Sequence, residues 1–288
     1  MPEPERRRAK VITVLNLKGG VGKTHTVWLL AAVCQERELR MLAFDTDTQA
    51  NLTGSFLPEP DERPGVEALF NASIDQDVRD LIHTTTFTHI DIVPARPALV
   101  HCDVSDYRLW ERSDLHLSLA EVVRQVRGEY DYVVFDCPPR LSLVSYAALC
   151  ASDYVIIPFE AADWGAQGIA HVTDSIQHVH GRHNRRLKLL GYLVSRFKRA
   201  RAYQQAYLAS LRRHYGPLAF DTVIPDLAQF ERSVIDRIPI TLHSPSSEEA
   251  AIARRFFDEV EARSQEQPRG SDAGVGDDAH EEPQLAAE

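Results

Sequence analysis

The hydrophobic positions of this chain form short continuous runs that alternate with longer segments of helical periodicity. Short apolar runs rich in β-branched residues are typical of strands buried on both faces. We place such strands at 11–15, 41–44, 90–93, 132–135, 154–157, 187–194 and 218–224. Apolar residues recur at helical spacing at 24–37, 118–126, 164–180, 203–213 and 246–263. This alternation predicts an α/β fold, with a doubly wound, mostly parallel sheet and helices on both of its faces.

Both ends of the 288-residue chain depart from this pattern. Residues 1–9 are polar, and we expect a flexible arm there. Residues 264–288 are rich in Gly, Pro, Ala and acidic residues, and we expect a disordered acidic tail. One folded domain is therefore expected over 10–263. No run of about 18 apolar residues and no secretory signal is present. Four scattered cysteines without a CxxC pair argue against disulfide, zinc-ribbon and iron–sulfur frameworks, and a cytoplasmic protein is expected.

A glycine-rich segment separates the first expected strand from the first expected helix. Residues 16–26 read Asn-Leu-Lys-Gly-Gly-Val-Gly-Lys-Thr-His-Thr, and Leu17 stands where the general phosphate-loop pattern has its first glycine. Such a loop presents backbone N–H groups and a helix N-terminus to phosphate. Lys23 is expected to reach the β and γ oxygens, and the Thr24 hydroxyl to bind Mg²⁺. A glycine-rich turn that binds nothing is the alternative, which the flanking strand and helix disfavour.

The segment Lys-Gly-Gly-Val-Gly-Lys-Thr at 18–24 resembles the deviant Walker A motif of the ParA/MinD family of P-loop ATPases, and is closest to the ParA/Soj type. The resemblance covers about 10–260. It implies ATP hydrolysis with ATP and Mg²⁺ as cofactors, and a homodimer in the ATP state in which Lys18 reaches the phosphates of the partner subunit. The nucleotide contacts that it implies are Lys18, Gly19, Gly20, Val21, Gly22, Lys23, Thr24 and His25. His25 replaces the usual threonine of the family.

Two acidic strand ends extend the resemblance. Asp-Thr-Asp-Thr-Gln at 45–49 is similar to the family's Asp-x-Asp-Pro-Gln switch, with Thr48 in place of proline. The resemblance implies that Asp47 orients or activates the attacking water and that Asp45 lies near the water shell of the metal. The run at 130–139 resembles the Walker B strand, and implies that Asp136 holds Mg²⁺ through water. Pro225 ends a segment that resembles the one beside the adenine in the family.

The implied roles can be grouped. The catalytic residues are Lys18, Lys23 and Asp47, and the metal-site residues are Thr24, Asp45 and Asp136.

The net charge of −10 is unevenly distributed. No Asp or Glu occurs between Ser175 and Phe220, a stretch with ten Lys or Arg residues. Basic contacts to phosphates give affinity without sequence readout, so nonspecific DNA is the expected partner. The expected DNA-binding residues are Arg196, Lys198, Arg199, Arg201, Arg212 and Arg213. A solvated basic face is the alternative. Asp226 also follows Pro225 where ParA proteins often carry a basic residue.

The family that this chain resembles divides by what its members bind. The ParA-like branch binds DNA and positions plasmids, chromosomes or protein cargo, whereas the MinD-like branch binds membranes through an amphipathic helix. The acidic tail, with seven acids and one Arg, would be repelled by anionic lipid, so we expect no membrane partner. We therefore expect a nucleoid-associated, ParA-like ATPase that works with a ParB-like or other cargo adaptor. The alternatives are a family member that binds other proteins but no DNA, and a membrane-bound MinD-like ATPase.

Overall fold

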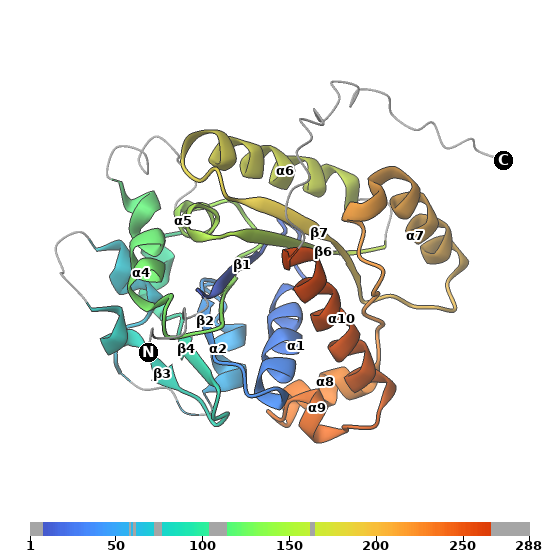
Figure 1. The fold of residues 1–288 in the computed structure, drawn as a ribbon, viewed down its shortest axis with the longest axis horizontal. Helices are drawn as coiled ribbons and strands as arrows, with labels where there is room; N and C mark the ends of the chain where they lie inside the picture. Colours follow the sequence, from blue (N-terminus) through green and yellow to red (C-terminus); the bar gives the residue numbers. More distant parts are fainter. Residues whose placement is uncertain are drawn as a thin grey trace, which may run out of the picture.

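A single mixed sheet forms the centre of the molecule (Figure 1). The computed structural model describes residues 8–57, 59, 62–71, 77–103, 114–161 and 165–265, without the side chains of 165–170. Within these residues seven strands pair in the order β3-β4-β2-β5-β1-β6-β7. The strands are β1 (Lys10–Val14), β2 (Met41–Asp45), β3 (His83–Thr84), β4 (Ile90–Val93), β5 (Tyr132–Asp136), β6 (Tyr154–Glu160) and β7 (Lys188–Ser195). Every pair is parallel except β3 with β4, which confirms the predicted mostly parallel α/β sheet.

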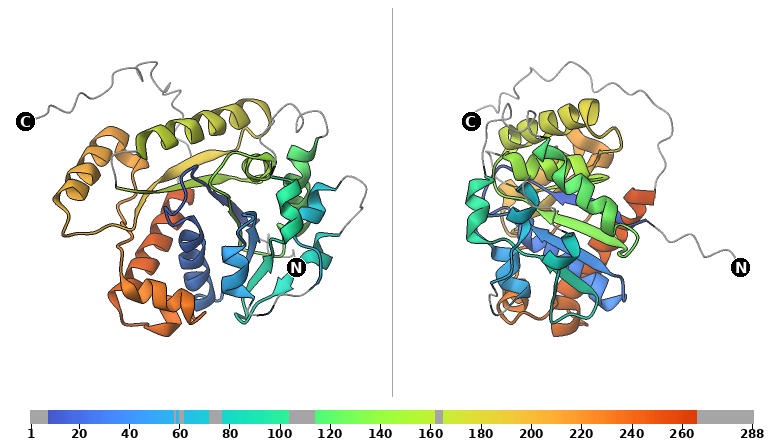
Figure 2. Two further views of the ribbon diagram at one scale, coloured as in Figure 1. Left: turned by 180° about the vertical axis from the view of Figure 1, so that it is seen from behind. Right: turned by 90° about the vertical axis from the view of Figure 1, so that its left-hand side faces the viewer.

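Helices cover both faces of this sheet (Figures 1 and 2). They are α1 (Lys23–Glu36), α2 (Asn51–Phe56), α4 (Ser118–Val126), α5 (Leu143–Ala151), α6 (Gly165–Arg182), α7 (Ala202–Tyr215), α8 (Ala228–Ile235), α9 (Ile240–His243) and α10 (Glu248–Gln265). Short 3₁₀ turns lie at Val66–Phe70, Val78–Leu81, Pro97–His101, Leu115–Leu117 and Gly216–Leu218.

The alternation of side chains along the strands explains why both faces need helices. Val11 in β1 and Leu15 directly after it face one apolar core, which α4, α5, α6 and α7 complete. Ile12 and Val14 face a second core, which is closed by α1, α2, α8, α9 and α10. Strands buried on both sides have no polar alternation, and this is the reason that their sequences read as continuous apolar runs.

The register of the central strands places two carboxylates side by side. Asp45 ends β2 and Asp136 ends β5, and these two residues are directly paired across the two strands. Val14 at the end of β1 pairs with Asp136 from the other side. The loop that follows β1 therefore begins next to both acids, at the carboxyl edge where parallel α/β sheets bind ligands.

The strand expected at 218–224 is not formed, and this prediction was wrong. The segment runs beside β7 with only isolated bridges to it and its immediate neighbours. The N–H groups of Asp221 and Thr222 donate instead to the Glu259 carboxylate of α10, at 2.8 and 2.9 Å. The apolar residues of the segment are explained by Phe220, which is buried against Phe256 of α10.

The sequence pattern did not predict α2, α5, α8 and α9. Every residue of α5 is buried, so no polar face marks it as a helix. The helices α2, α8 and α9 have only six, eight and four residues, too few to establish a period.

The ends of the folded part lie slightly outside the expected limits. Ala9 is buried and its N–H donates to the carbonyl of Arg127, whereas a flexible arm was expected through residue 9. Helix α10 continues to Gln265, two residues into the expected tail. Residues 1–7 and 266–288 lie outside the described residues.

Candidate nucleotide site

A cavity of about 700 Å³ opens at the carboxyl edge of the sheet. The loop after β1, the start of α1, the residues after β2 and β7, and helix α8 all contribute to its wall. Eight of the twelve residues predicted as nucleotide contacts or as catalytic and metal-site residues line it, namely Gly19, Gly20, Gly22, Lys23, Thr24, His25, Asp47 and Pro225. Lys18, Val21, Asp45 and Asp136 are the predicted site residues that are not part of this lining.

The loop after β1 leads directly into α1. Gly20 and Gly22 have left-handed backbones, with φ of 75° and 83°, which side-chain-bearing residues rarely adopt. Among the described residues no side chain caps the start of α1, and its first turn contains no acid. The free N–H groups and the positive end of the helix dipole consequently form an anion site.

Lys23 lies beneath this loop, and only 7% of its surface is exposed. Its Nζ donates to the carbonyl oxygen of Lys18 at 3.0 Å. Burial lowers the pKa of Lys23, while Asp136 and then Asp47 act in the opposite direction. The ammonium group thus stands between the loop and two acids, where an incoming phosphate can serve as its counter-charge.

The environment of Asp136 suits a divalent cation. Both of its carboxylate oxygens are buried without a hydrogen-bond partner of good geometry in the described structure. Burial and then Asp45 raise its pKa well above the ordinary value, whereas Thr24 and Lys23 lower it. A cation between Asp136 and the Thr24 hydroxyl would stabilise the ionised carboxylate. Within the described residues, no group of three His, Cys, Asp or Glu side chains could hold a metal alone, which fits a Mg²⁺ site completed by water and phosphates.

Asp45 and Asp47 have different surroundings. The Oδ2 of Asp45 accepts from the N–H and the hydroxyl of Thr53, at 2.7 and 2.8 Å, and its Oδ1 accepts from the N–H of Asp47. Asp45 therefore anchors α2, and both of its carboxylate oxygens already accept hydrogen bonds from the chain. Burial raises its pKa to about 6, against the opposing effect of Thr53. Asp47 does line the cavity, and its carboxylate accepts from the N–H of Gln49 at 3.0 Å.

Lys18 and Val21 occupy the outer and inner sides of the loop. Lys18 is exposed and, within its own subunit, is not among the residues that line the cavity. The side chain of Val21 is buried in the core below the loop, so only its backbone can contact a nucleotide.

An aromatic group closes one side of the cavity, and the sequence reasoning missed most of it. The ring of His25 meets that of Phe230 edge to face, with centroids 4.9 Å apart, and Trp28 lies one helical turn further along α1. The Nε2 of His25 and the Nε1 of Trp28 are both buried without a hydrogen-bond partner in the described structure. Burial, then Arg196, lowers the pKa of His25 to about 4, so the ring is neutral at pH 7. The i, i+3 spacing of His25 and Trp28 is the signal that could have revealed this face.

Cys137, which replaces the usual threonine after Asp136, is a buried thiol. Burial raises its pKa to about 12, so the thiol stays protonated at neutral pH.

The structure separates the residues that were expected to bind DNA. Arg196 lines the nucleotide cavity, and its Nη1 donates to the carbonyl oxygen of Gly20 at 3.2 Å. Lys198 forms an ion pair with Asp226 at 3.0 Å, and Arg199 forms one with Glu248 at 2.7 Å. The acid-free stretch therefore meets acids from elsewhere in the chain, which linear charge counting cannot show.

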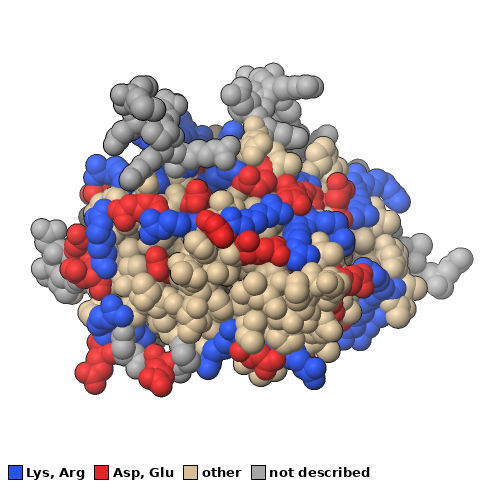
Figure 3. Space-filling model, turned by 60° about the horizontal axis from the view of Figure 1, so that its bottom comes forward, with Lys and Arg blue, Asp and Glu red and all other residues tan. Residues whose placement is uncertain are grey.

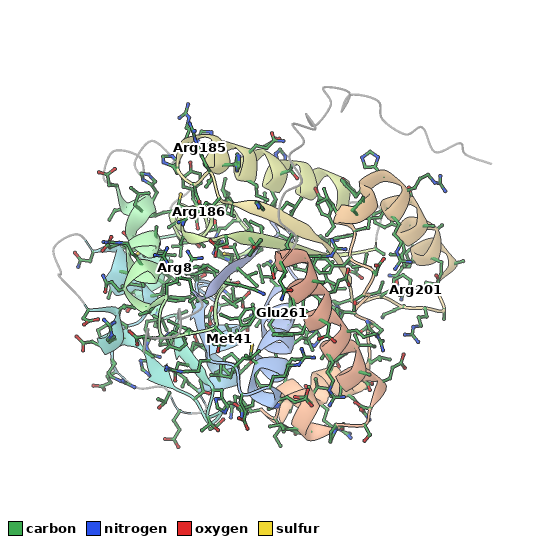
Figure 4. All side chains as sticks on the ribbon, viewed as in Figure 1. Arg8, Met41, Arg185, Arg186, Arg201 and Glu261 are labelled. Carbon is green, nitrogen blue, oxygen red and sulfur yellow. The ribbon has the colours of Figure 1, made fainter. Side chains whose placement is uncertain are left out.

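The other three expected DNA-binding residues have no acidic partner among the described residues. Arg201 donates to the Tyr203 hydroxyl at 2.7 Å, Arg212 donates to the carbonyl of Asp221, and Arg213 has no ion pair with any described residue. Figure 4 shows Arg201 beside α7 at the outer edge, whereas Arg185 and Arg186 lie at the opposite end of β7. The ten basic residues consequently do not form one continuous surface.

Comparison with known proteins agrees with this site. The profile of a protein family described as an AAA domain matches residues 9–189, more than half of the chain. The chromosome-partitioning ATPase Soj of Thermus thermophilus is 36% identical over 264 residues, which cover 90% of this chain and 99% of Soj. The chain belongs to the ParA/MinD family of deviant Walker A P-loop ATPases.

Solved structures of other proteins share the fold of this family member. An ATP complex of a McdA variant from Cyanothece superposes with a TM-score of 0.77 at 19% identity, covering 91% of this chain and 98% of McdA. Cobyrinic acid a,c-diamide synthase of Mycobacterium smegmatis, with bound ADP and magnesium, gives a TM-score of 0.72 at 26% identity and covers 87% of this chain and 93% of the synthase. In the described part of this ParA/MinD-family chain, no helix is both long and apolar enough to cross a bilayer.

Proposed function

We propose that this chain binds ATP with Mg²⁺, hydrolyses it, dimerises in the ATP state and binds DNA without sequence specificity to position a cargo. The observation that carries the nucleotide part is that Lys23, Thr24 and Asp47 line one cavity, while the buried Asp136 lies close enough to act electrostatically on Lys23. This set contains the positive charge, the hydroxyl and the two acids that phosphoryl transfer from ATP requires.

The residues divide the work as follows. Lys23 and the N–H groups of the loop bind and neutralise the phosphates, while Thr24 and Asp136 would hold Mg²⁺. The cation, when bound, would neutralise charge that develops on the phosphate oxygens. Asp47 orients the attacking water from the wall of the cavity. Asp45 holds Asp47 and α2 in place through the bonds to Thr53 and to the Asp47 N–H.

Two features support a dimer in the ATP state. Lys18 is exposed and is not part of the cavity lining in its own subunit, as a residue that serves the phosphates of a partner would be. Ile235, in the wall of the cavity on α8, is 78% exposed, and Ile238 and Leu242 continue this apolar edge. In Figure 3, where the side carrying α8 and α9 comes forward, a broad area without charged side chains lies beside a band of mixed charges. A second subunit would bury such an edge.

Arg201, Arg212 and Arg213 remain the best supported DNA contacts, because no acidic side chain in the described structure pairs with them. The ion pairs of Lys198 and Arg199 favour the second candidate, a family member that binds other proteins and no DNA. If the protein is the DNA-binding ATPase proposed first, it is associated with the nucleoid, and a ParB-like or other adaptor stimulates hydrolysis and brings the cargo.

DNA retention measured with ATP, with ADP and without nucleotide tests the proposal. With ATP we expect retention of unrelated duplexes, with a log–log salt slope of about −0.9 per phosphate contact. The double variant Arg201→Glu/Arg213→Glu should lose retention. The matched control Arg185→Glu/Arg186→Glu makes the same charge change at the far end of β7 and should keep it. An ATP-bound dimer without DNA retention at about 50 mM salt would establish the second candidate instead.

A further inference from the structure

The turn at the end of β7 touches the phosphate loop directly. Ser195 is buried as the last residue of β7, and Arg196 follows it with a left-handed backbone, φ 51°. A residue with a side chain is strained in this conformation, so the surrounding structure must hold it there.

Two carbonyl groups of the loop receive hydrogen bonds from this turn. The Ser195 hydroxyl donates to the carbonyl oxygen of Val21, and Arg196 Nη1 donates to that of Gly20 at 3.2 Å. The packing is close, since a Cβ atom on Gly22 would lie 3.3 Å from the Ser195 hydroxyl. Ser195 and Arg196 thus hold consecutive peptide groups of the loop from outside.

These contacts determine which way the peptide groups point. A phosphate loop binds anions through N–H groups that converge on the phosphates, so the carbonyl oxygens of the same peptides must point away. A carbonyl that points away needs a donor, or the peptide can turn and place its negative end in the site. Arg196 supplies that donor for Gly20, and its positive charge adds to the attraction for phosphate.

The same turn continues into the basic segment. The N–H of Phe197 donates to the carbonyl of Ile224, and the N–H of Asp226 donates to the carbonyl of Phe197, so this residue is bonded on both sides to the segment around Pro225. Phe197 is also buried, with 4% exposed. Lys198 then pairs with Asp226. The turn therefore connects the phosphate loop, the Pro225 wall of the cavity and residues 198–201.

We propose that Arg196 is a positioning residue that holds the phosphate loop open for ATP and couples occupancy of the site to DNA binding by Arg201, which follows it in the same segment. The proposal gives Arg196 a role in the nucleotide site in place of the DNA contact suggested by its sequence. It rests on ATP as the ligand of the loop, as proposed above. Coupling of this kind is reciprocal, because DNA must strengthen ATP binding by the factor by which ATP strengthens DNA binding.

The first test measures the affinity for a fluorescent ATP analogue carrying a methylanthraniloyl group on its ribose. Arg196→Gly removes the side chain but suits the left-handed backbone, so strain does not confuse the result. We expect about tenfold weaker binding, as for the loss of one hydrogen bond to a charged group. Arg196→Lys should restore most of the affinity. Arg185→Ala, which removes the same charge at the far end of β7, should bind the analogue as the wild type does.

The second test measures the ratio of DNA affinities with saturating ATP and saturating ADP. Arg196→Gly should bring this ratio toward one, whereas Arg201→Ala should weaken DNA binding in both states and leave the ratio unchanged. An Arg196→Gly variant that binds the analogue within about twofold of the wild type overturns the positioning role, and an unchanged ratio overturns the coupling. If the wild type retains no DNA in any state, the proposed DNA function fails, while the analogue titration still decides the role of Arg196 in the loop.

Discussion

A nearly isosteric substitution of Thr53 tests how the buried Asp45 is held at the end of β2. Its hydroxyl donates to Asp45 Oδ2 at 2.8 Å and accepts the N–H of Ala95 at 3.0 Å. Thr53→Val keeps the shape and removes both bonds. The lost bond to a charged group costs about 1.5–3 kcal/mol, and an unsatisfied buried N–H costs about 1–3 kcal/mol. Because the Thr53 N–H still donates to Asp45, we expect a total loss of about 2–4 kcal/mol in the free energy of unfolding at pH 8.

The pH dependence of this loss identifies its cause. Burial raises the pKa of Asp45 to about 6, and the Thr53 bonds oppose that shift. A carboxyl whose pKa is raised in the folded state costs stability as the pH rises from its unfolded value through its folded value. Thr53→Val raises the folded pKa further, so its extra cost is complete above that pKa and shrinks below it. At pH 5 Asp45 is mostly protonated, and the lost bond is a neutral one worth about 0.5–1.5 kcal/mol.

Urea unfolding at pH 5 and pH 8, without nucleotide, measures both losses. Ser55→Ala is the control, because Ser55 lies on the same helix and its hydroxyl donates only to the Asn51 carbonyl at 2.9 Å. Its effect should stay within about 0.5 kcal/mol at both pH values. A Thr53→Val loss that is equal at the two pH values would refute the assignment of Asp45 as the buried acceptor.

Further predictions concern the nucleotide site and the tail. Lys23→Ala should weaken ATP binding at least about a hundredfold in equilibrium dialysis, since it removes the charge that neutralises the phosphates, and unchanged binding would contradict its position. Asp47→Ala should bind ATP as the wild type does and slow hydrolysis about a hundredfold or more in a phosphate-release assay; wild-type turnover would remove Asp47 from the mechanism. Lys18→Ala should bind ATP but show no ATP-dependent shift in sedimentation, and an unchanged shift would exclude its action on the partner subunit. Deletion of 266–288, which removes a net charge of −6, should tighten DNA retention at low salt and have no effect at high salt, where charge is screened.

The fold and the phosphate-binding half of the site could be predicted because both depend on neighbours in the sequence. A strand, a glycine loop and a helix start follow one another within 10–36, so backbone geometry is implied by residue type. Pro225 was predicted at the cavity only from the family resemblance. It lies far along the chain from the phosphate loop, so no local sequence pattern indicates that the two meet.

The remaining features depend on contacts between distant residues. Asp226 and Glu248 neutralise Lys198 and Arg199 from other segments, so a stretch without acids is not a free basic surface. In the sequence, Arg196 belongs to this basic stretch. In the structure its left-handed backbone directs the side chain to the carbonyl of Gly20, and the sequence does not indicate that turn. The division of labour between two acids one residue apart likewise depends on Thr53, which is eight residues beyond Asp45.

The segment at 218–224, which does not form a strand, also hinders association with other chains at the edge of the sheet. An outermost strand normally offers a row of free N–H and C=O groups, to which a strand from another chain can add. Here the segment beside β7 bonds to it through the Phe220 and Ile224 N–H groups, while Glu259 occupies two of the segment's remaining N–H groups. This segment therefore cannot itself pair with another strand at those positions. Substitution of Glu259 would leave these N–H groups free to pair with a strand of another chain. We would then expect lower solubility at high protein concentration, with the nucleotide site intact.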